Sequence, residues 1–187
     1  MKNINILFIL IMSFTTILQG QEKIINLNLS EIKWVGKEIT TKTHYGSLKF
    51  KKGNISKVND LITAGEFIVD MNSLKNEDLS GGSKDYLEKH LRSDDFFGVE
   101  QHPTATLKII SVKKVEGEKH LVVGDLKIKG INNQVTFNIV LNAKDATAEL
   151  TFDRSKYGVR FRSSSFFDEL GDKLIYDDIE LKVDLVF

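Results

Sequence analysis

The stretch "DDIELKVDLVF" (177–187) carries the pattern that decides the fold class of this chain. From Ile179 to Phe187 an apolar side chain recurs at every second position, and charged side chains fill most of the gaps. A period of two is typical of a β-strand with one polar and one apolar face. Such a strand suits an outer-membrane barrel, with its apolar face in lipid, or a barrel in water, with that face turned inward around a ligand.

The same alternation recurs along most of the chain. Strand-like patterns cover residues 46–58, 61–71, 104–112, 121–128, 135–141 and 146–152. Turn-forming residues at 52–54, 116–118 and 130–133 separate several of these stretches. With both ends of the chain included, about eight antiparallel strands are expected, and closing them into a barrel removes the unpaired edges. The predicted fold is therefore all-β, an eight-stranded antiparallel barrel that is either packed solid or wide enough for one small ligand.

One long connection interrupts the strands. Residues 72–103 contain no good strand pattern, whereas 84–92 is typical of a short helix with Ser83 as its N-cap. Three residues share the apolar face of this helix: Leu87, His90 and Leu91. The stretch "SDDFF" (93–97) follows, where Ser93 can cap one more turn that presents two phenylalanines. We expect this helical segment to pack on the barrel.

Three features favour a barrel in water over one in a membrane. One Trp and four Tyr, scattered along the chain, do not supply the aromatic girdles of a membrane barrel. The apolar face of the predicted helix needs a protein core to cover it. The alternating stretches also span about five to eight residues, and a tilted membrane strand needs roughly nine to eleven. We expect a domain that does not span the membrane.

Residues 1–20 have the pattern of a secretory signal peptide. A weakly basic start precedes an apolar run, 4–18, that is shorter than the roughly 20 residues needed to cross a bilayer. We expect cleavage after Gly20, one domain over residues 21–187, and a periplasmic or secreted protein; an uncleaved anchor is the alternative. Because the chain has no cysteine, neither a lipid-modified cysteine nor a disulfide is expected.

Charge and motif spacing argue against several function classes. Without residues 1–20 the chain has 25 basic and 26 acidic residues, a net charge of −1, which disfavours a nucleic-acid partner. The four histidines show no metal-ligand spacing. Asp94 and Asp95 follow Ser93, where helix capping explains them better than acid–base catalysis. We expect no metal, no cofactor and no enzymatic activity.

Four motifs resemble, in the same order, those of the YceI-like family of lipocalin-like, polyisoprenoid-binding proteins. They are "GEFIVDMNSL" (65–74), "HLRSDDFFGVEQHPTATLKI" (90–109), "VVGDLKIKGINNQVTFNIVL" (122–141) and "FDRSKYGVRF" (152–161). The resemblance runs from about residue 25 to 187. It implies an eight-stranded lipocalin-like barrel with a helix near its mouth, a periplasmic or secreted location and no catalysis. It also implies an apolar lumen that holds a polyisoprenoid, an isoprenoid quinone or a fatty-acyl chain, and two copies of the chain can pair.

The lumen is the main candidate site. Strand parity nominates eleven inward-facing residues: Phe50, Phe67, Val69, Leu107, Leu126, Ile128, Phe137, Ile139, Phe152, Val183 and Leu185. A dry, continuous tunnel is enough to hold a long alkyl chain, because each buried CH₂ contributes about 0.8 kcal/mol. The alternative is a filled core with no cavity. Trp34 either plugs one end of the barrel or lines it.

The candidate for a head-group contact is the basic stretch that follows residue 153. Arg154, Arg160 and Arg162 lie in "DRSKYGVRFR" (153–162), and guanidinium groups bind diphosphate well. The alternative is a solvated loop, or an ion pair between Arg154 and Asp153 or another carboxylate. His44 is expected to be buried and hydrogen-bonded, not to bind a ligand.

Overall fold

The computed structural model describes residues 20–59 and 61–187. The predicted signal peptide, residues 1–20, lies outside the described residues except for Gly20. The described part contains nine strands: β1 (Gln21–Ile24), β2 (Glu31–Lys37), β3 (Thr43–Val58), β4 (Leu61–Asn76), β5 (Thr104–Glu116), β6 (Lys119–Ile128), β7 (Ile131–Leu141), β8 (Asp145–Asp153) and β9 (Asp178–Val186). It also contains one α-helix, α1 (Gly81–Arg92), and two 3₁₀ turns, η1 (Arg154–Tyr157) and η2 (Gly171–Lys173).

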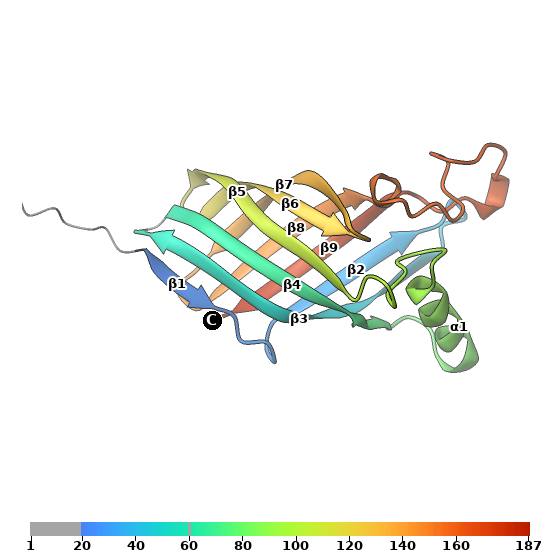
Figure 1. Ribbon diagram of the computed structural model, residues 1–187, viewed down its shortest axis with the longest axis horizontal. Helices are drawn as coiled ribbons and strands as arrows, with labels where there is room; N and C mark the ends of the chain where they lie inside the picture. The colour runs from blue at the N-terminus through green and yellow to red at the C-terminus, as the bar shows by residue number, and fades with distance from the viewer. Residues whose placement is uncertain (1–19, 60) are drawn as a thin grey trace, which may run out of the picture.

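The strands form a single antiparallel sheet that closes on itself (Figure 1). On one edge, β3 pairs with β2 through Thr43–Leu48 and with β1 through Asn54–Lys57, so β1 and β2 share one position in the sheet. On its other edge β3 pairs with β4, and this pairing closes the barrel. The predicted eight-stranded antiparallel barrel with one helix is therefore confirmed.

Two predicted boundaries are wrong. The turn expected at 52–54 does not form; β3 runs through it with an irregularity between Phe50 and Lys52. Gly53 is there for a packing reason, since a Cβ atom on it would lie 2.7 Å from Ile25 and 2.8 Å from Phe67. Strand β4 also continues past residue 71 to Asn76, whose backbone N–H donates to Glu88 of the following helix and whose side chain donates to Asp78 of the following loop.

A two-residue turn joins β6 to β7 at Lys129 and Gly130. Both residues have positive φ angles, 49° and 77°, which is the backbone of a two-residue hairpin whose twist matches the strands. The lysine is enclosed rather than free at the loop tip. Its ammonium donates to the carbonyl oxygens of Asp94 and Phe96, at 3.0 Å and 2.8 Å. The hairpin thereby fixes the 93–97 turn.

Helix α1 lies at one end of the barrel, and β1 lies at the other (Figure 1). It begins after Ser80, three residues earlier than predicted, and packs mainly on β4. Leu91 is buried and Leu87 packs against the core, so the predicted apolar face is correct. The 93–97 turn follows, with Phe96 buried. In the part of the chain described, no helix has the length and hydropathy needed to cross a bilayer.

All eleven side chains nominated by strand parity face the barrel interior. Eight of them are buried, and Val69, Leu107 and Val183 are partly buried against the same core. The alternating positions are exposed, as for Glu149 and Lys182, which form an ion pair of 3.7 Å on the outer surface. Local alternation therefore placed the two faces of the sheet correctly.

Candidate functional site

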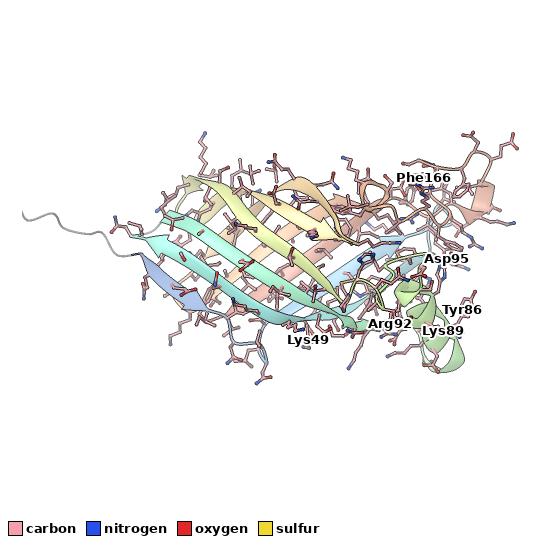
Figure 2. The ribbon with its side chains drawn as sticks, viewed as in Figure 1. Lys49, Tyr86, Lys89, Arg92, Asp95 and Phe166 are labelled. Carbon is pink, nitrogen blue, oxygen red and sulfur yellow. The ribbon has the colours of Figure 1, made fainter. Side chains whose placement is uncertain are left out.

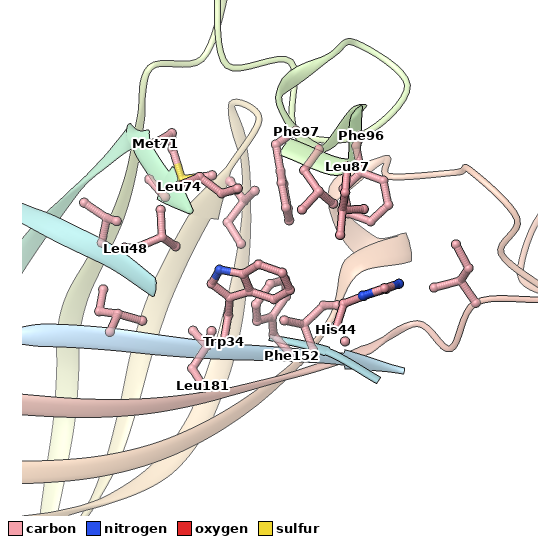
Figure 3. A pocket seen from close by; sticks show the side chains of 18 of the residues that line it. Trp34, His44, Leu48, Met71, Leu74, Leu87, Phe96, Phe97, Phe152 and Leu181 are labelled. Atoms are coloured by element: carbon pink, nitrogen blue, oxygen red, sulfur yellow. The ribbon is translucent and has the colours of Figure 1, made fainter. Parts of the chain in front are cut away.

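An apolar cavity of about 140 Å³ lies in the half of the barrel nearest α1 (Figure 3). Its wall is formed by inward-facing residues of seven strands, among them Trp34, Leu48, Val69, Leu126, Phe152 and Leu181. Its roof comes from α1 and the turn after it: Leu87, His90, Leu91, Phe96 and Phe97. Few residues of the lining are polar. They include Lys37, Glu38, His44 and His90.

The residues that line the cavity do not run the whole length of the barrel. On four strands, the next inward-facing residue toward β1 lies two positions from a lining residue. These four residues are Phe50, Phe67, Leu107 and Val183. The rings of Phe50 and Phe67 lie 6.0 Å apart, centroid to centroid. Phe50, Phe67 and Leu107 lie on the neighbouring strands β3, β4 and β5, and Val183 lies on β9. We call these four residues the floor layer, because they are the first inward-facing positions below the lining.

Part of the nominated set borders the cavity. Four of them line the cavity: Val69, Leu126, Ile128 and Phe152. The other seven pack in the core outside the lining: Phe50, Phe67, Leu107, Phe137, Ile139, Val183 and Leu185. Parity identifies the side of the sheet that a residue faces, but it does not say whether the opposite strand fills the space in front of it. Whether the individual residues contact a ligand stays a prediction.

Trp34 lines the cavity and does not plug an end of the barrel (Figure 3). Its indole nitrogen donates a hydrogen bond of 3.1 Å to the carbonyl oxygen of Lys75. Gly46 makes this contact possible, because it pairs with Trp34 across the strands. A Cβ atom on Gly46 would lie 1.8 Å from the Lys75 oxygen and 2.9 Å from the indole ring. The glycine thus holds β3, β4 and the indole in close contact.

Asp78 connects the mouth of the barrel to the loop that precedes α1. Its carboxylate accepts hydrogen bonds from the backbone N–H of Tyr45, at 2.9 Å, and from the side chain of Asn76, and contacts Nδ1 of His44 at 2.7 Å. Burial alone raises the pKa of Asp78, but these hydrogen bonds and the nearby imidazole outweigh it and hold the pKa below 3.8. His44 is therefore hydrogen-bonded, as expected, although it also reaches the cavity.

Glu88 anchors α1 itself to the end of β4. Its carboxylate accepts from the backbone N–H of Asn76 at 2.9 Å and pairs with Arg92 at 3.2 Å. Arg92 in turn donates to the carbonyl oxygen of Leu74. Burial raises the pKa of Glu88, but the hydrogen bonds from Asn76 and Arg92 lower it by more, so the pKa lies below its ordinary value. The roof of the cavity is thus attached by two carboxylates that are ionised at neutral pH.

The structure argues against a head-group role for Arg154. The side chain is fully buried, with an ion pair of 3.2 Å to Asp177. The guanidinium also donates to three backbone carbonyl oxygens, those of Val159, Ile175 and Tyr176. Its carbon lies 5.2 Å from the centre of the Phe96 ring. Burial lowers the pKa of Arg154, and Asp177 raises it. This arginine fastens the 154–177 segment beneath the 93–97 turn, and its hydrogen-bonding groups are in use.

Arg160 and Arg162 lie outside the cavity. The guanidinium of Arg160 stacks on Phe166 at 4.9 Å, and that of Arg162 on Phe161 at 5.1 Å. Both line a separate, more open groove together with Asp94 and Asp95, at the α1 end of the barrel (Figure 2). The pair of arginines and the pair of carboxylates leave this groove without excess positive charge. The structure therefore does not bring the three nominated arginines together.

The sequence analysis did not identify His90 as a site residue. Its position on the apolar face of the predicted helix was the signal that could have identified it. Its ring lies 4.3 Å from Phe161 and 5.8 Å from Phe96, centroid to centroid, between the cavity and the charged groove. Burial, the largest effect, lowers the pKa of His90 below 6.5; Asp95 raises it and Arg162 lowers it. The imidazole is accordingly neutral at neutral pH.

Comparisons with known proteins agree with this geometry. The sequence model of the YceI-like domain matches residues 24–187. A UPF0312 protein of Photorhabdus laumondii is 33% identical over 100 residues, which cover 52% of each chain. A UPF0312 protein of Staphylococcus aureus is 31% identical over 114 residues, 55% of this chain and 62% of that protein. The chain thus spans between half and two thirds of the length of these curated relatives.

Solved structures share the fold at low sequence identity. BcnA of Burkholderia cenocepacia superimposes with a TM-score of 0.67 at 20% identity, over 87% of this chain and 99% of that chain. A polyisoprenoid binding domain of Saccharophagus degradans gives a TM-score of 0.58 at 14% identity, over 89% of this chain and 97% of that chain. At these identities the likeness shows the fold alone. The described barrel, its roof and its apolar cavity are the features available for function.

Proposed function

The chain belongs to the YceI-like family, and from that premise we propose that it binds the apolar chain of a lipid in the cavity beneath α1. The chain would be a polyisoprenoid, an isoprenoid quinone or a fatty-acyl compound. The protein would carry or store this lipid without changing it chemically. The observation that carries the proposal is the apolar cavity itself, with its helical roof.

The energetics of burial support a tail-binding role. A chain that enters the cavity gains about 0.8 kcal/mol for each CH₂ removed from water and needs few directional contacts. A volume of about 140 Å³ is close to that of an engineered cavity of roughly 150 Å³ that holds benzene. A long tail would therefore have to displace the floor layer or extend through the mouth. A short, branched isoprenoid segment would fit first.

Binding is a better account than catalysis because the titratable groups near the mouth are already in use. The carboxylate of Asp78 holds His44 and Tyr45, and that of Glu88 holds Asn76 and Arg92. These groups attach the roof of the cavity. A roof held by a few polar contacts can open and close over an apolar ligand while the barrel stays intact.

The place of action is part of the proposal. The pattern of residues 1–20 supports export, and we expect the mature chain to begin at Gln21, in the periplasm or outside the cell. Pairing of two copies, which the family resemblance implies, also stays a prediction. N-terminal sequencing of the protein from its host and light scattering of the purified chain test the two expectations.

The binding proposal is tested by extracting folded protein into organic solvent and analysing the extract by mass spectrometry. We expect one chain lipid, or a narrow series, to be released by the wild-type protein. Ala105 lies in the cavity wall, so Ala105→Leu should fill part of the space and reduce the released lipid several-fold. The matched control, Thr151→Leu, adds the same side chain at an exposed position of β8 and should leave the yield unchanged.

A titration is needed as well, because a bound lipid that is lost during purification would escape the extraction experiment. Farnesol added to the extracted protein should change the fluorescence of Trp34 and produce a mass shift under native conditions. If neither lipid release nor farnesol binding is found, the barrel is a ligand-free structural or interaction module and the proposal is wrong.

A further inference from the structure

The exposed aromatic side chains gather at the end of the barrel that contains the cavity. In residues 20–59 and 61–187, five aromatic side chains are exposed: Tyr45, Tyr86, Phe166, Phe167 and Tyr176. They belong to α1, to the start of β3 and to the connection between β8 and β9, which lie at the α1 end, and Figure 2 shows Tyr86 and Phe166 there. At the opposite end the exposed apolar side chains are aliphatic, as at the start of β4 and the end of β5. The two ends of the barrel therefore offer different chemistry to a partner.

A short ribbon joins this aromatic surface to the rim of the cavity. Glu38 and Ile175, which both line the cavity, face each other in a β-bridge. Their neighbours Ile39 and Tyr176 are 43% and 47% exposed. Two backbone hydrogen bonds of 3.0 Å, one on each side of the bridge, hold the two segments together. A surface that covers Ile39 and Tyr176 therefore lies next to the cavity rim.

Two phenylalanines extend the exposed apolar surface along the loop that precedes this ribbon. Phe166 is 39% exposed and Phe167 is 50% exposed. The base of the loop is fixed, because the buried hydroxyl of Ser163 donates a hydrogen bond of 2.8 Å to the carboxylate of Asp177. The loop projects beyond the ends of the strands (Figure 1). We call the four exposed residues of loop and ribbon the mouth patch: Ile39, Phe166, Phe167 and Tyr176.

The charge around the mouth patch favours a partner surface without net charge. Residues 160–176 contain three basic and three acidic side chains: Arg160, Arg162, Lys173, Asp168, Glu169 and Asp172. Segments that bind anionic lipids instead carry clusters of about four to eight basic residues. The groove beside Phe167 likewise contains two guanidinium groups and two carboxylates. This balance matches a headgroup that has one positive and one negative charge.

The type of exposed side chain favours a lipid surface over water or a protein. Tyrosine is enriched where a membrane meets water, because its ring is apolar and its hydroxyl is polar. Phenylalanine is typical of the apolar faces that insert between headgroups. Phe166 and Phe167 lie on the loop that projects, and Tyr176 lies nearer the cavity rim. The arrangement is that of a protein end that rests on a bilayer with its cavity toward the lipid.

We propose that the mouth patch docks on a bilayer of zwitterionic phospholipid, with its rings at the level of the headgroups. A lipid tail then passes between the bilayer and the cavity without crossing water. Docking is reversible, since only a few side chains insert. The docking surface goes beyond the proposed function, whereas the transfer of a lipid through it rests on that function.

Flotation of the full mature chain with phosphatidylcholine vesicles tests the docking surface. The wild-type protein should float with these vesicles. Because the charge around the patch is balanced, admixture of anionic phosphatidylglycerol or added salt should change the bound fraction by less than about twofold. The variant Phe166→Ser with Phe167→Ser should bind the vesicles about tenfold more weakly, since two apolar side chains are lost from the contact.

Two further variants assign the effect to the patch. Ile110→Ser with Val115→Ser is the matched control, because both residues are exposed on the half of β5 that runs away from α1; vesicle binding should be unchanged. Phe167→Trp keeps an aromatic ring suited to the interface and should retain docking. All three variants should bind farnesol in solution as the wild type does, since none of the substituted residues lines the cavity.

The outcomes separate docking from lipid binding. If farnesol binds in solution but the wild-type protein does not float with vesicles, only the inference is overturned. Flotation that persists in the double phenylalanine variant, or that requires phosphatidylglycerol, would also overturn it. A dimer in light scattering that this variant dissociates, without flotation of the wild type, would assign the patch to contact between two copies. Patch-dependent flotation without farnesol binding would support the docking surface and count against the proposed function.

Discussion

At the scale of single residues, the environment decides what a side chain does. Arg154 and Arg160 are six positions apart and have the same chemistry, yet one is fully buried in an ion pair and the other stacks on an exposed ring. Removing one partner of a buried pair leaves the other charge uncompensated, which costs far more than the loss of an exposed ion pair.

This contrast gives a prediction about stability. Arg154→Gln should lower the free energy of unfolding by about 3–5 kcal/mol, because Asp177 and three carbonyl oxygens lose their partner. Arg160→Gln should change it by less than about 0.5 kcal/mol, as is usual for a surface substitution. Urea unfolding of both variants measures the two values. Similar values for the two would show that Arg154 is not the structural residue inferred here.

At the scale of elements, α1 is a roof attached at its edges. Its apolar face covers the cavity, and its polar attachments run through Asp78 before the helix and Glu88 within it. Both carboxyls have pKa values below their ordinary values of 3.8 and 4.5. A group with a depressed folded pKa stabilises the fold above its unfolded pKa and loses that contribution as the pH falls through the folded pKa.

We therefore expect acid to loosen the roof before the barrel. As the pH falls below 4.5, the protection factors of the α1 amides, which correct for the intrinsic pH dependence of exchange, should fall more than those of β6, which has no part in this network. The variant Asp78→Asn with Glu88→Gln should show faster exchange in α1 already at neutral pH, and little further change in acid. An equal acid response in wild type and variant would assign the effect to other carboxyls.

At the scale of the whole molecule, the described cavity occupies one part of the barrel. It lies under α1, and the floor layer lies between its lining and the β1 end. Phe67 belongs to this floor and packs against Phe50 and against Ile25 near Gly53. The length of ligand that the barrel accepts should therefore depend on the floor more than on the mouth.

Phe67→Ala should extend the cavity toward β1 and shift the binding preference from geraniol toward farnesol and geranylgeraniol. The substitution should cost about 3–5 kcal/mol of stability, as large-to-small changes in cores do. Phe137→Ala is the matched control: Phe137 is similarly buried but does not belong to the floor layer, so the loss of stability should be similar and the chain-length preference unchanged. An unchanged preference in both variants would show that the floor does not limit ligand length.

The sequence by itself determined the closed antiparallel barrel, the inward face of each strand and the apolar face of α1. These properties are local: alternation such as that of Ile179–Phe187 and the helical spacing of Leu87 and Leu91 are visible within a few neighbouring residues. Motif order similarly identified the family. The strand boundaries were predicted less accurately than the strand faces. Gly53 suggested a turn, but this glycine lies within β3, where Ile25 and Phe67 leave no room for a side chain.

Only the tertiary structure decided how far the cavity extends, which arginine is buried and which rings surround the helix that roofs the cavity. Phe50 and Phe67 lie close together on the paired strands β3 and β4, Arg154 pairs with Asp177 across 22 intervening positions, and His90 contacts Phe161 from another part of the chain. Each of these contacts joins residues that a linear pattern does not relate. Periodicity tells which way a side chain points, but the space in front of it is filled by distant residues that only the folded chain brings there.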